Sequence, residues 1–563
     1  MILKALYDYY NRCGNLAVKG YEFKEIGYLI VLEKDGSFVR LESRIINKKT
    51  ASSFMVLQAV KRTGKKYVPN YFWDKYEYIV GGDGESEIKH KTFVNMVVDF
   101  KSKLPKNEYV DAIYNFYSKN EDVKSAISKD ILYNELIKSN KNISFLIRGN
   151  TKIAAEDNDI KNTVLSEYSD NRSSNICLVL GKKASIVRLH TKINLSKDTG
   201  ALVAFQTSCG YNSYGKERGY NAPISEEAEF AYTTALNAML SKNSHNKFMI
   251  GSRTFLFWAS SDSDASKKTE EGLFSLFGKF EAKEDDPNRR IELVRDTFMS
   301  VYNGKLNANK NDKFFILGLA PNSARIAVVY WSELPLREFA GLISRHFEDM
   351  KIVDTRKEKK PYVGLHSILG SVTLGGKSSD ATPNLPEAVV KSIFQGLPYP
   401  ISLFQACIRR IRAEQSVTIV RAAIIKAYLN RINNNNNIKI KIMLDKENQN
   451  QGYLCGRLFA VLDKIQEDAN GIHSIRERYM NSASSTPATV FSTILNLSAH
   501  HLEKLNNGKQ VYYEKLKQEI VSKLDADGFP AHLSLQDQGR FFVGYYHQRQ
   551  DFFTSKEDKE TED

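Results

Sequence analysis

The sequence predicts an α+β protein, in which a mixed, mostly antiparallel β-rich N-terminal region with helical insertions precedes a C-terminal α-helical bundle. Short apolar runs bounded by turn residues recur between residues 24 and 260, as expected of strands. Helical spacing of apolar residues dominates after Leu334. The asparagine run 433–437 then precedes a last segment whose pattern is entirely helical. Because 563 residues exceed what one core can serve, we expect about two to four domains.

The first predicted region, residues 1–140, is an α+β region with a basic loop. Residues 24–58 contain two strands around the turn Lys34-Asp35-Gly36-Ser37, and Asp-Gly between apolar runs is a strong hairpin signal. A further strand is predicted within residues 76–87. Residues 92–140 are predicted to be helical, because their apolar residues recur at helical spacing.

The second predicted region, residues 141–335, is β-rich with a helical insertion. Its predicted strands lie within residues 143–149, 176–181, 185–190, 201–206, 254–260 and, as a pair, 313–332. The insertion is a helix near residues 226–241 with Ser225 as its N-cap, although Ala228 stands where a complete capping box needs Glu or Gln. The polar residues 261–290 are expected to form a loop.

Two helical regions complete the prediction, residues 336–432 and residues 443–563. In the second, Leu454, Leu458 and Leu462 fall on one stripe of a helix. A segment of about 120 residues is large enough to fold as a bundle of its own. The charged end of the chain is expected to be disordered.

The charge is unevenly distributed along the chain. The whole chain has 80 lysines and arginines, 66 acidic residues and a net charge of +14. Residues 443–563 hold 14 of the basic and 18 of the acidic residues, which leaves 66 basic and 48 acidic residues in residues 1–442. A basic excess of this size favours a polyanionic partner such as nucleic acid, the alternative being a protein that is merely basic.

The cysteines and the apolar runs indicate in which cellular compartment the protein is expected. The five cysteines are odd in number and none forms a CxxC pair, which fits a reducing cytoplasm better than a disulfide framework. The N-terminus lacks a signal-peptide pattern, and no run of apolar residues is long enough to span a membrane. We therefore expect a soluble cytoplasmic protein without a membrane partner.

The search for catalytic patterns predicts a protein that is not an enzyme. The stretch Leu374–Ser378 imitates the end of a phosphate-binding loop, but Ser371 stands where that loop needs a glycine. His500 and His501 lack an acidic partner at ligand spacing. We expect no catalytic residue, no cofactor and no metal site. The alternative from another class is a metal-dependent nuclease whose carboxylates are dispersed along the chain.

Basic and aromatic residues gather around Gly64, and this is the first candidate for a DNA contact. Lysines there would contact phosphates, an asparagine could read a minor-groove edge, and an aromatic could stack on a base. Trp73 is expected to pack in the core rather than to insert as a wedge between bases. The alternative for the whole stretch is that its aromatic residues belong to the core and its lysines form a solvated face. The candidate residues are Lys61, Arg62, Lys65, Lys66, Asn70 and Tyr71.

The second candidate combines a strand with a turn bounded by Gly215 and Gly219. Residues 188, 190 and 192 would share one face of a strand, and the glycines would let the backbone approach a phosphate. The alternatives are a seam with another protein, or an Arg188 that pairs with a carboxylate. The candidate nucleic-acid-binding residues are Arg188, His190, Lys192, Lys216, Arg218 and Asn221.

The third candidate is the helical stretch 406–431, which could follow a single strand. Helical geometry places Arg410 and Arg421 on one side and Arg412 and Lys426 on roughly the opposite side, so the charges do not form one clean face. The alternative is a charged helix that packs among several neighbours. The candidate residues are Arg409, Arg410, Arg412, Arg421 and Lys426.

Blocks distributed along almost the whole chain resemble the large subunit of the type I-C CRISPR Cascade complex. The fullest block is Asn175–Leu240, and the N-terminal MILKALYDYYNRCGN is also similar. The other similar blocks are Lys61–Gly81, Phe314–Trp331, Gly396–Arg431 and Gly452–Gly471.

The resemblance implies a non-catalytic, DNA-binding subunit of a crRNA-guided surveillance complex. Such a subunit would recognise the protospacer-adjacent motif, aid duplex opening, stabilise the R-loop and help to recruit the helicase–nuclease, while the guide RNA reads the sequence. The residues around Gly64 would then read the motif, and the stretch 406–431 would hold the non-target strand. The implied partners are target double-stranded DNA and its displaced strand, the crRNA, the backbone and crRNA-end subunits, a small subunit and the helicase–nuclease.

The resemblance also gives Met443 a possible role. In that family the C-terminal part can be made separately, as the small subunit, from an internal start, and Met443 is the position that would begin such a product here. The alternative is an ordinary core methionine. A third view of the whole protein, a scaffold that binds only protein, predicts no salt-dependent affinity for DNA.

Overall fold

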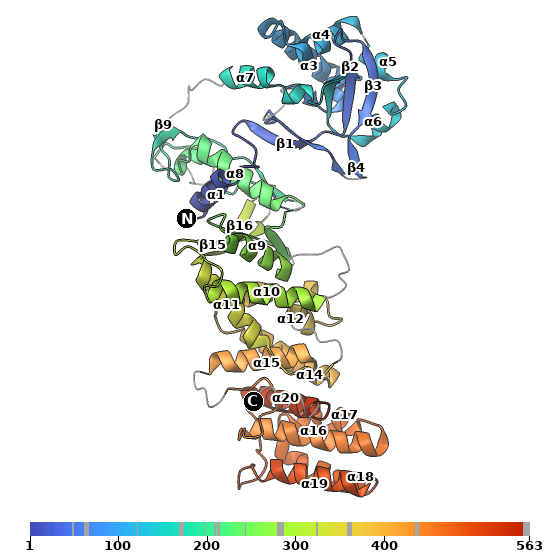
Figure 1. Ribbon diagram of the computed structural model, residues 1–563, viewed down its shortest axis with the longest axis vertical. Helices are drawn as coiled ribbons and strands as arrows, with labels where there is room; N and C mark the ends of the chain where they lie inside the picture. The colour runs from blue at the N-terminus through green and yellow to red at the C-terminus, as the bar shows by residue number, and fades with distance from the viewer. Residues whose placement is uncertain are drawn as a thin grey trace. The chain divides into compact units, whose positions relative to one another are not determined.

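A computed structural model describes most of the chain (Figure 1). The described residues are 1–47, 50–60, 67–120, 122–167, 174–195, 198–207, 210, 214–242, 244–250, 252–277, 287–322, 325–356, 363–433 and 439–554. They fall into two compact units. The smaller unit is Cys13–Thr191 with Val203–Leu236, and the larger unit is Met1–Arg12, Lys192–Leu202 and Asn237–Asp563. The chain therefore passes between the units after residues 12, 191, 202 and 236.

The smaller unit is built on a four-stranded sheet of order β3-β2-β8-β7. Its strands are β2 (Tyr28–Leu32), β3 (Phe38–Ser43), β7 (Trp73–Asp74) and β8 (Ile143–Ile147). β2 and β3 form the predicted hairpin, where Gly36 takes a φ of +89° and the backbone NH of Ser37 donates to Asp35 Oδ1 at 2.9 Å. β2 pairs with β8 in parallel, so the predicted boundary after residue 140 falls between α6 (Tyr133–Ser139) and a strand of this same sheet.

Helices cover one face of this sheet and a two-stranded ribbon covers the other. The helices are α2 (Tyr76–Ile79), α3 (Glu85–Lys103), α4 (Glu108–Lys119), α5 (Val123–Ile127) and α6. Their core includes Phe93, Phe116 and Phe145, all of them buried. The ribbon pairs β1 (Tyr21–Glu25) with β6 (Ser53–Leu57), and it packs with Trp73 in a separate cluster. The helices 92–140 are confirmed.

The strand predicted within residues 76–87 is wrong, because α2 and the start of α3 occupy it. Gly84, with a φ of +63°, ends the turn before α3, and Glu85 and Glu87 lie in the first turn of that helix, where its dipole favours acidic residues. Apolar alternation over a few residues could not reveal this helix start.

The remainder of the smaller unit is largely irregular. Its elements are β4 (Ile45–Asn47), β5 (Thr50–Ala51), η1 (Ala154–Glu156), α7 (Asn158–Glu167), β9 (Ser174–Ile176), β10 (Lys183–Ser185), η2 (Arg218–Asn221) and most of α8 (Glu226–Leu240). The helix α8 is confirmed, and the backbone NH of Ala228 donates to Ser225 Oγ at 3.2 Å, as an N-cap requires. The strands predicted within residues 176–181, 185–190 and 201–206 are mostly wrong. β9 and β10 pair over three residues each, and Gly181 turns the chain with a φ of +67°.

The larger unit contains an antiparallel sheet of order β13-β14-β15-β16. Its strands are β13 (Lys247–Ile250), β14 (Arg253–Ala259), β15 (Lys313–Asn322) and β16 (Arg325–Pro335), while β11 (Ile193–Leu195) and β12 (Asp198–Gly200) form a separate pair. The predicted strands around residue 321 and within 254–260 are confirmed. The loop predicted for residues 261–290 is wrong over α9 (Asp264–Phe277), whose Ala265, Leu273 and Phe277 are buried on one side despite its polar composition.

The N-terminal helix α1 (Ile2–Arg12) belongs to the larger unit. Its Tyr9 packs edge-on against Trp258 with ring centroids 6.3 Å apart. The Arg12 guanidinium donates to the backbone oxygens of Ala259 at 3.1 Å and Ser261 at 3.2 Å. The first residues of the chain are thus fixed to the end of β14.

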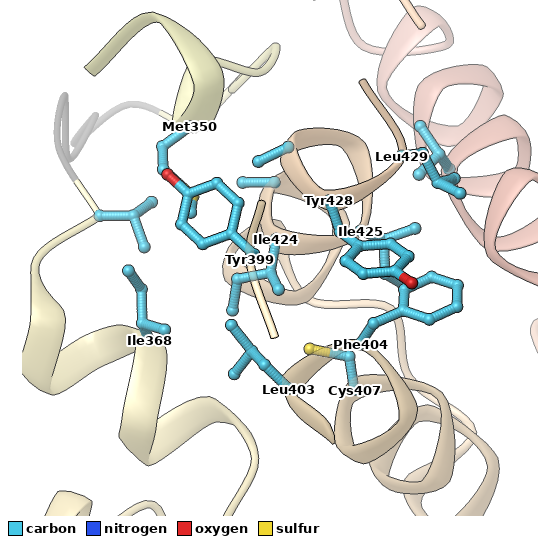
Figure 2. Packing of buried hydrophobic residues seen from close by; sticks show 14 of the residues in the cluster. Met350, Ile368, Tyr399, Leu403, Phe404, Cys407, Ile424, Ile425, Tyr428 and Leu429 are labelled. Atoms are coloured by element: carbon cyan, nitrogen blue, oxygen red, sulfur yellow. The ribbon is translucent and has the colours of Figure 1, made fainter. Parts of the chain in front are cut away.

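Helices make up the rest of the larger unit, and one apolar cluster extends through them from Phe248 to Tyr545. They are α10 (Pro287–Tyr302), α11 (Leu336–Met350), α12 (Leu365–Ser371), η3 (Ser378–Asp380), α13 (Leu385–Phe394), α14 (Ile401–Glu414) and α15 (Ile419–Ile432). Figure 2 shows the part of the cluster in which Tyr428 of α15 stacks on Phe404 of α14, with ring centroids 4.4 Å apart.

The C-terminal helices continue this core rather than forming a separate one. They are α16 (Gln451–Asn470), α17 (Ser474–Ala483), η5 (Pro487–Thr489), α18 (Phe491–Leu502), α19 (Asn507–Val521) and α20 (Leu535–Asp551). α20 packs against α16 on one side, and its Gly539 lies against Phe404 and Ile425 of α14 and α15. The predicted α+β class with a C-terminal helical region is confirmed. Among the described helices, none is long and apolar enough to cross a membrane.

Candidate nucleic-acid interface

The first candidate is the basic loop predicted around Gly64, which lies between β6 and β7 in the chain. Lys61, Arg62, Lys65 and Lys66 lie outside the described residues, but both ends of their segment are described. The segment follows β6 of the two-stranded ribbon and precedes β7 of the four-stranded sheet.

Asn70 fastens the two ends of this connection together. Its Oδ1 accepts a hydrogen bond from the backbone NH of Val60 at 3.0 Å, and its own backbone NH donates to Asp74 Oδ2 at 2.9 Å. Asn70 is only 5% exposed and Asp74 only 1%. Since the amide oxygen is already used within the fold, we assign Asn70 to loop closure rather than to base reading.

The aromatic residues beside Asn70 pack inward. Tyr71 is half-buried, and its ring meets Phe100 edge-on with centroids 5.9 Å apart. Phe72 is buried with a φ of +59°, and its carbonyl accepts a hydrogen bond from Ser144 Oγ at 2.8 Å. Trp73 is buried, as its core interpretation expects. These rings support the loop, and none of the three projects from the surface.

The fold brings three further lysines to this edge of the sheet, which the sequence search missed. Lys24 Nζ lies 5.2 Å from the centroid of the Trp73 ring. Lys75 Nζ donates to the backbone oxygen of Asn140 at 2.5 Å, and Lys141 follows in the chain. Burial is the main cause of the lowered pKa of Lys75. The positive charges of Lys24 and Lys141 lower this pKa further. No spacing in the sequence links residues from three separate segments, so only the tertiary fold reveals them.

Three cationic residues of the second candidate, Arg188, Lys216 and Arg218, lie in the smaller unit on a loop that is held by hydrogen bonds. Arg188 pairs with Glu217 at 3.1 Å, which was one of the alternatives for this residue. Lys216 is exposed and Arg218 is half-buried with a φ of +48°. Asn221 Nδ2 donates to the backbone oxygens of Lys216 at 3.2 Å and Arg218 at 3.0 Å, so Asn221 closes the turn.

The other two residues of the second candidate are not part of that loop. The stretch 186–192 is not a strand, so residues 188, 190 and 192 do not share a strand face. His190 is buried, and its Nδ1 lies 2.6 Å from the Tyr232 hydroxyl. Lys192 is exposed and belongs to the larger unit. His190 therefore supports the loop from inside the smaller unit.

The third candidate consists largely of side chains that brace the helices of the larger unit. Arg421 is 5% exposed, bonds to the backbone oxygen of Ser371 at 2.9 Å and pairs with Glu414. Arg410 pairs with the same carboxylate, and Arg412 donates to Gln538 Oε1 at 3.0 Å.

Lys426, another residue of the third candidate, is buried slightly more deeply than Arg421. It is 3% exposed, and burial lowers its pKa to about 8, against the attraction of Asp349 and Glu348. Of the five residues, Arg409 alone is fully exposed. We therefore leave Arg421 and Lys426 out of any strand-binding surface, because helix α15 is surrounded by neighbours, which was the alternative interpretation.

The remaining motifs of the sequence lie in the larger unit. Within that part of the chain, no group of three His, Cys, Asp or Glu side chains is placed to hold a metal ion. The stretch Leu374–Ser378 follows helix α12 rather than a strand, and its Gly375 and Gly376 both have positive φ. Met443 is half-buried in an irregular segment between α15 and α16.

Comparison with known proteins places the chain in a family. A family model described as CRISPR-associated protein (Cas_Csd1) matches residues 6–553. No curated protein matches the chain significantly. The family match covers both units and every candidate surface described above. The chain belongs to the Cas_Csd1 family of CRISPR-associated proteins and is a Cascade-type subunit, which acts in a complex with other Cas subunits and crRNA.

Proposed function

We propose that the chain is the large subunit of a type I-C Cascade complex, and that it recognises the protospacer-adjacent motif through the basic loop 61–66. In this role it aids duplex opening, stabilises the R-loop and helps to recruit the helicase–nuclease. The observation that carries the proposal is the hydrogen bond from the backbone NH of Val60 to the buried Asn70, which joins the two described ends of the segment that holds the four cationic residues.

The electrostatics of the loop and its surroundings suit a DNA backbone. Lysine and arginine side chains neutralise phosphates and release counterions, which gives affinity without sequence information. Lys24, Lys75 and Lys141 lie near β7, where Lys24 pairs with Glu22 at 3.8 Å and Lys141 with Glu25 at 3.4 Å. With Asn70 held in loop closure, direct motif reading falls to the loop's own side chains, of which an arginine has the fork geometry that suits guanine.

We further propose that the chain does not cleave DNA itself. The carboxylates of the described surfaces are used in ion pairs, such as Glu217 with Arg188 and Glu414 with Arg410 and Arg421. Cleavage would then belong to the recruited helicase–nuclease.

The test compares target binding by the assembled complex with duplexes whose flanking bases are randomised. The loop variant is Lys65→Ala/Lys66→Ala, and the charge-matched control is Lys504→Ala/Lys515→Ala, which removes two exposed lysines, one from the turn after α18 and one from α19. We expect the loop variant alone to lose discrimination between flanks, while binding to a pre-opened bubble persists.

Three results would contradict these proposals. If the loop variant keeps full discrimination, the motif is read elsewhere, and the surface at Arg188 and Lys216 becomes the next region to vary. If wild-type affinity does not fall as salt rises, the chain is a scaffold that binds only protein. Magnesium-dependent cutting of DNA by the purified chain would favour the nuclease alternative.

A further inference from the structure

Tyr214 exposes its side chain almost completely. It is 99% exposed, more than any other large apolar or aromatic side chain among the described residues. Its φ is +53°, and the next residue, Gly215, has a φ of +70°. A bulky residue in this left-handed region is strained, and no burial of the ring offsets that strain in the free chain.

The turn that follows Tyr214 is tightly held. Asn221 Nδ2 donates to the backbone oxygens of Lys216 and Arg218, and the backbone NH of Gly219 donates to the oxygen of Arg188 at 3.0 Å. A Cβ at Gly219 would lie only 2.4 Å from the backbone oxygen of Val187, so that position accepts glycine alone. A fixed turn therefore presents an aromatic ring to solvent.

The charges around this ring are mainly positive. Lys216 and Arg218 follow Tyr214 by two and four residues in the turn, while Glu217, the one acidic residue of residues 214–221, is paired with Arg188 at 3.1 Å. An exposed aromatic ring among cations matches a ligand that has both a flat face and a negative charge. Nucleotides combine these two properties, because every base has a π-face and every linkage a phosphate. A purely apolar protein pocket would not require the cations.

We propose that Tyr214 stacks on an unpaired base of the bound nucleic acid, while Lys216 and Arg218 contact the adjacent phosphates. This inference rests on the proposed function in one respect, namely that the chain binds nucleic acid. It is independent of the basic loop 61–66, because the two surfaces lie on different segments. The ring adds affinity for single-stranded or opened nucleic acid and reads no sequence.

The test measures binding of the full chain to a short oligothymidine that carries one fluorescent aminopurine. Stacking on an aromatic ring quenches this base, so quenching and affinity are followed together. The variants are Tyr214→Ala, which removes the ring, and Tyr214→Phe, which keeps it. Tyr512→Ala is the control, since Tyr512 is a 49% exposed tyrosine on α19. None of these positions needs its ring for the buried core.

We expect Tyr214→Ala to lose the quenching and to weaken binding about 5- to 150-fold, as base–aromatic stacking predicts. Tyr214→Phe and Tyr512→Ala should behave like wild type. Unchanged quenching and affinity in Tyr214→Ala, with salt-dependent binding intact, would overturn the stacking but leave the proposed function standing. Equal losses in the Ala and Phe variants would also overturn it, because the hydroxyl rather than the ring would then be responsible. If wild type binds no oligonucleotide even at low salt, the stacking is overturned, whereas the proposed function is decided by the assembled complex on duplex targets.

Discussion

Gly456 of α16 and Phe541 of α20 approach so closely that a Cβ on Gly456 would lie 2.0 Å from the carbonyl oxygen of Phe541. The contact is reciprocal, because a Cβ on Gly544 of α20 would lie 2.3 Å from the carbonyl oxygen of Tyr453. Two glycines, one on each helix, therefore set the separation of the C-terminal helix pair.

Gly456→Ala is expected to destabilise the larger unit by about 1–3 kcal/mol, because the added methyl group must push the two helices apart. Thermal unfolding followed by circular dichroism measures the effect. Gly508→Ala on α19 is the matched control, since its nearest neighbour atom would be 3.6 Å away. A melting temperature that falls equally in both variants would contradict the explanation by close approach.

Asn70→Ala is expected to lower stability by about 1–3 kcal/mol, because the backbone NH of Val60 loses its buried acceptor. Binding to targets should weaken to a similar degree for all flanking bases, since the loop loses its anchor rather than a reading group. Melting temperature and flank discrimination are measured on the same preparation. Unchanged stability with a selective loss for one flanking base would show that Asn70 reads the motif after all.

Lys426→Met is expected to stabilise the larger unit at neutral pH. Burial holds the folded-state pKa of Lys426 at about 8, below the ordinary 10.5, so folding favours the neutral amine. The charged lysine therefore costs stability below pH 8, and the cost disappears as the pH rises from 8 to 10.5. At 1.36 kcal/mol for each unit of pKa, the gain in the variant is at most about 3 kcal/mol.

The measurement is the difference in urea-unfolding free energy between Lys426→Met and wild type at several pH values. It should be largest below pH 8 and shrink towards pH 10.5. Lys515→Met, which changes an exposed lysine, should show no such trend. A difference that stays constant over this range would mean that Lys426 titrates normally in the folded protein.

A separate product beginning at Met443 would lack the helices that cover α20. In the full chain Arg412 bonds to Gln538, the Tyr546 hydroxyl donates to the oxygen of Val353 at 2.8 Å, and Gly539 lies against Phe404. We expect such a product to associate with itself or with another subunit through this uncovered face. Sedimentation of residues 443–563 at several concentrations measures the association.

The existence of the product is tested separately with Met443→Leu, a change of similar volume at a half-buried position. If translation starts at this codon, the shorter polypeptide disappears from cells that express the variant, and the full chain remains. Persistence of the shorter polypeptide would place its origin elsewhere. A product that sediments as a stable monomer would contradict the need for a covering partner.

The sequence predicted those elements whose signals are local. The hairpin at Asp35-Gly36 and the cap at Ser225 depend on neighbouring residues alone, and both are present. The helix α9 was missed because its composition is polar and only one narrow side is buried. Short apolar runs near residues 176–190 suggested strands, whereas the chain there is held by loop hydrogen bonds such as that from Leu178 NH to the oxygen of Pro223.

For the candidate surfaces too, the sequence predicted only those features that depend on neighbouring residues. Charge and spacing located the turn at Lys216, because a surface turn carries its chemistry in consecutive residues. Helical periodicity could not predict that Arg421 and Lys426 are buried. A helix with neighbours on every side buries charged and apolar positions alike. Lys24, Lys75 and Lys141 come from three segments, and only the paired strands bring them together.

The docking of α1 has a consequence for the order in which the chain emerges from the ribosome. Arg12 bonds to the backbone oxygen of Ala259, which is 247 residues further along the chain. At about 5–20 residues per second, translation supplies that partner on the order of 10–50 s later, after all segments of the smaller unit have been made. Until then the first helix has no sheet to bind, and the nascent chain carries an exposed amphipathic end that chaperones can reach.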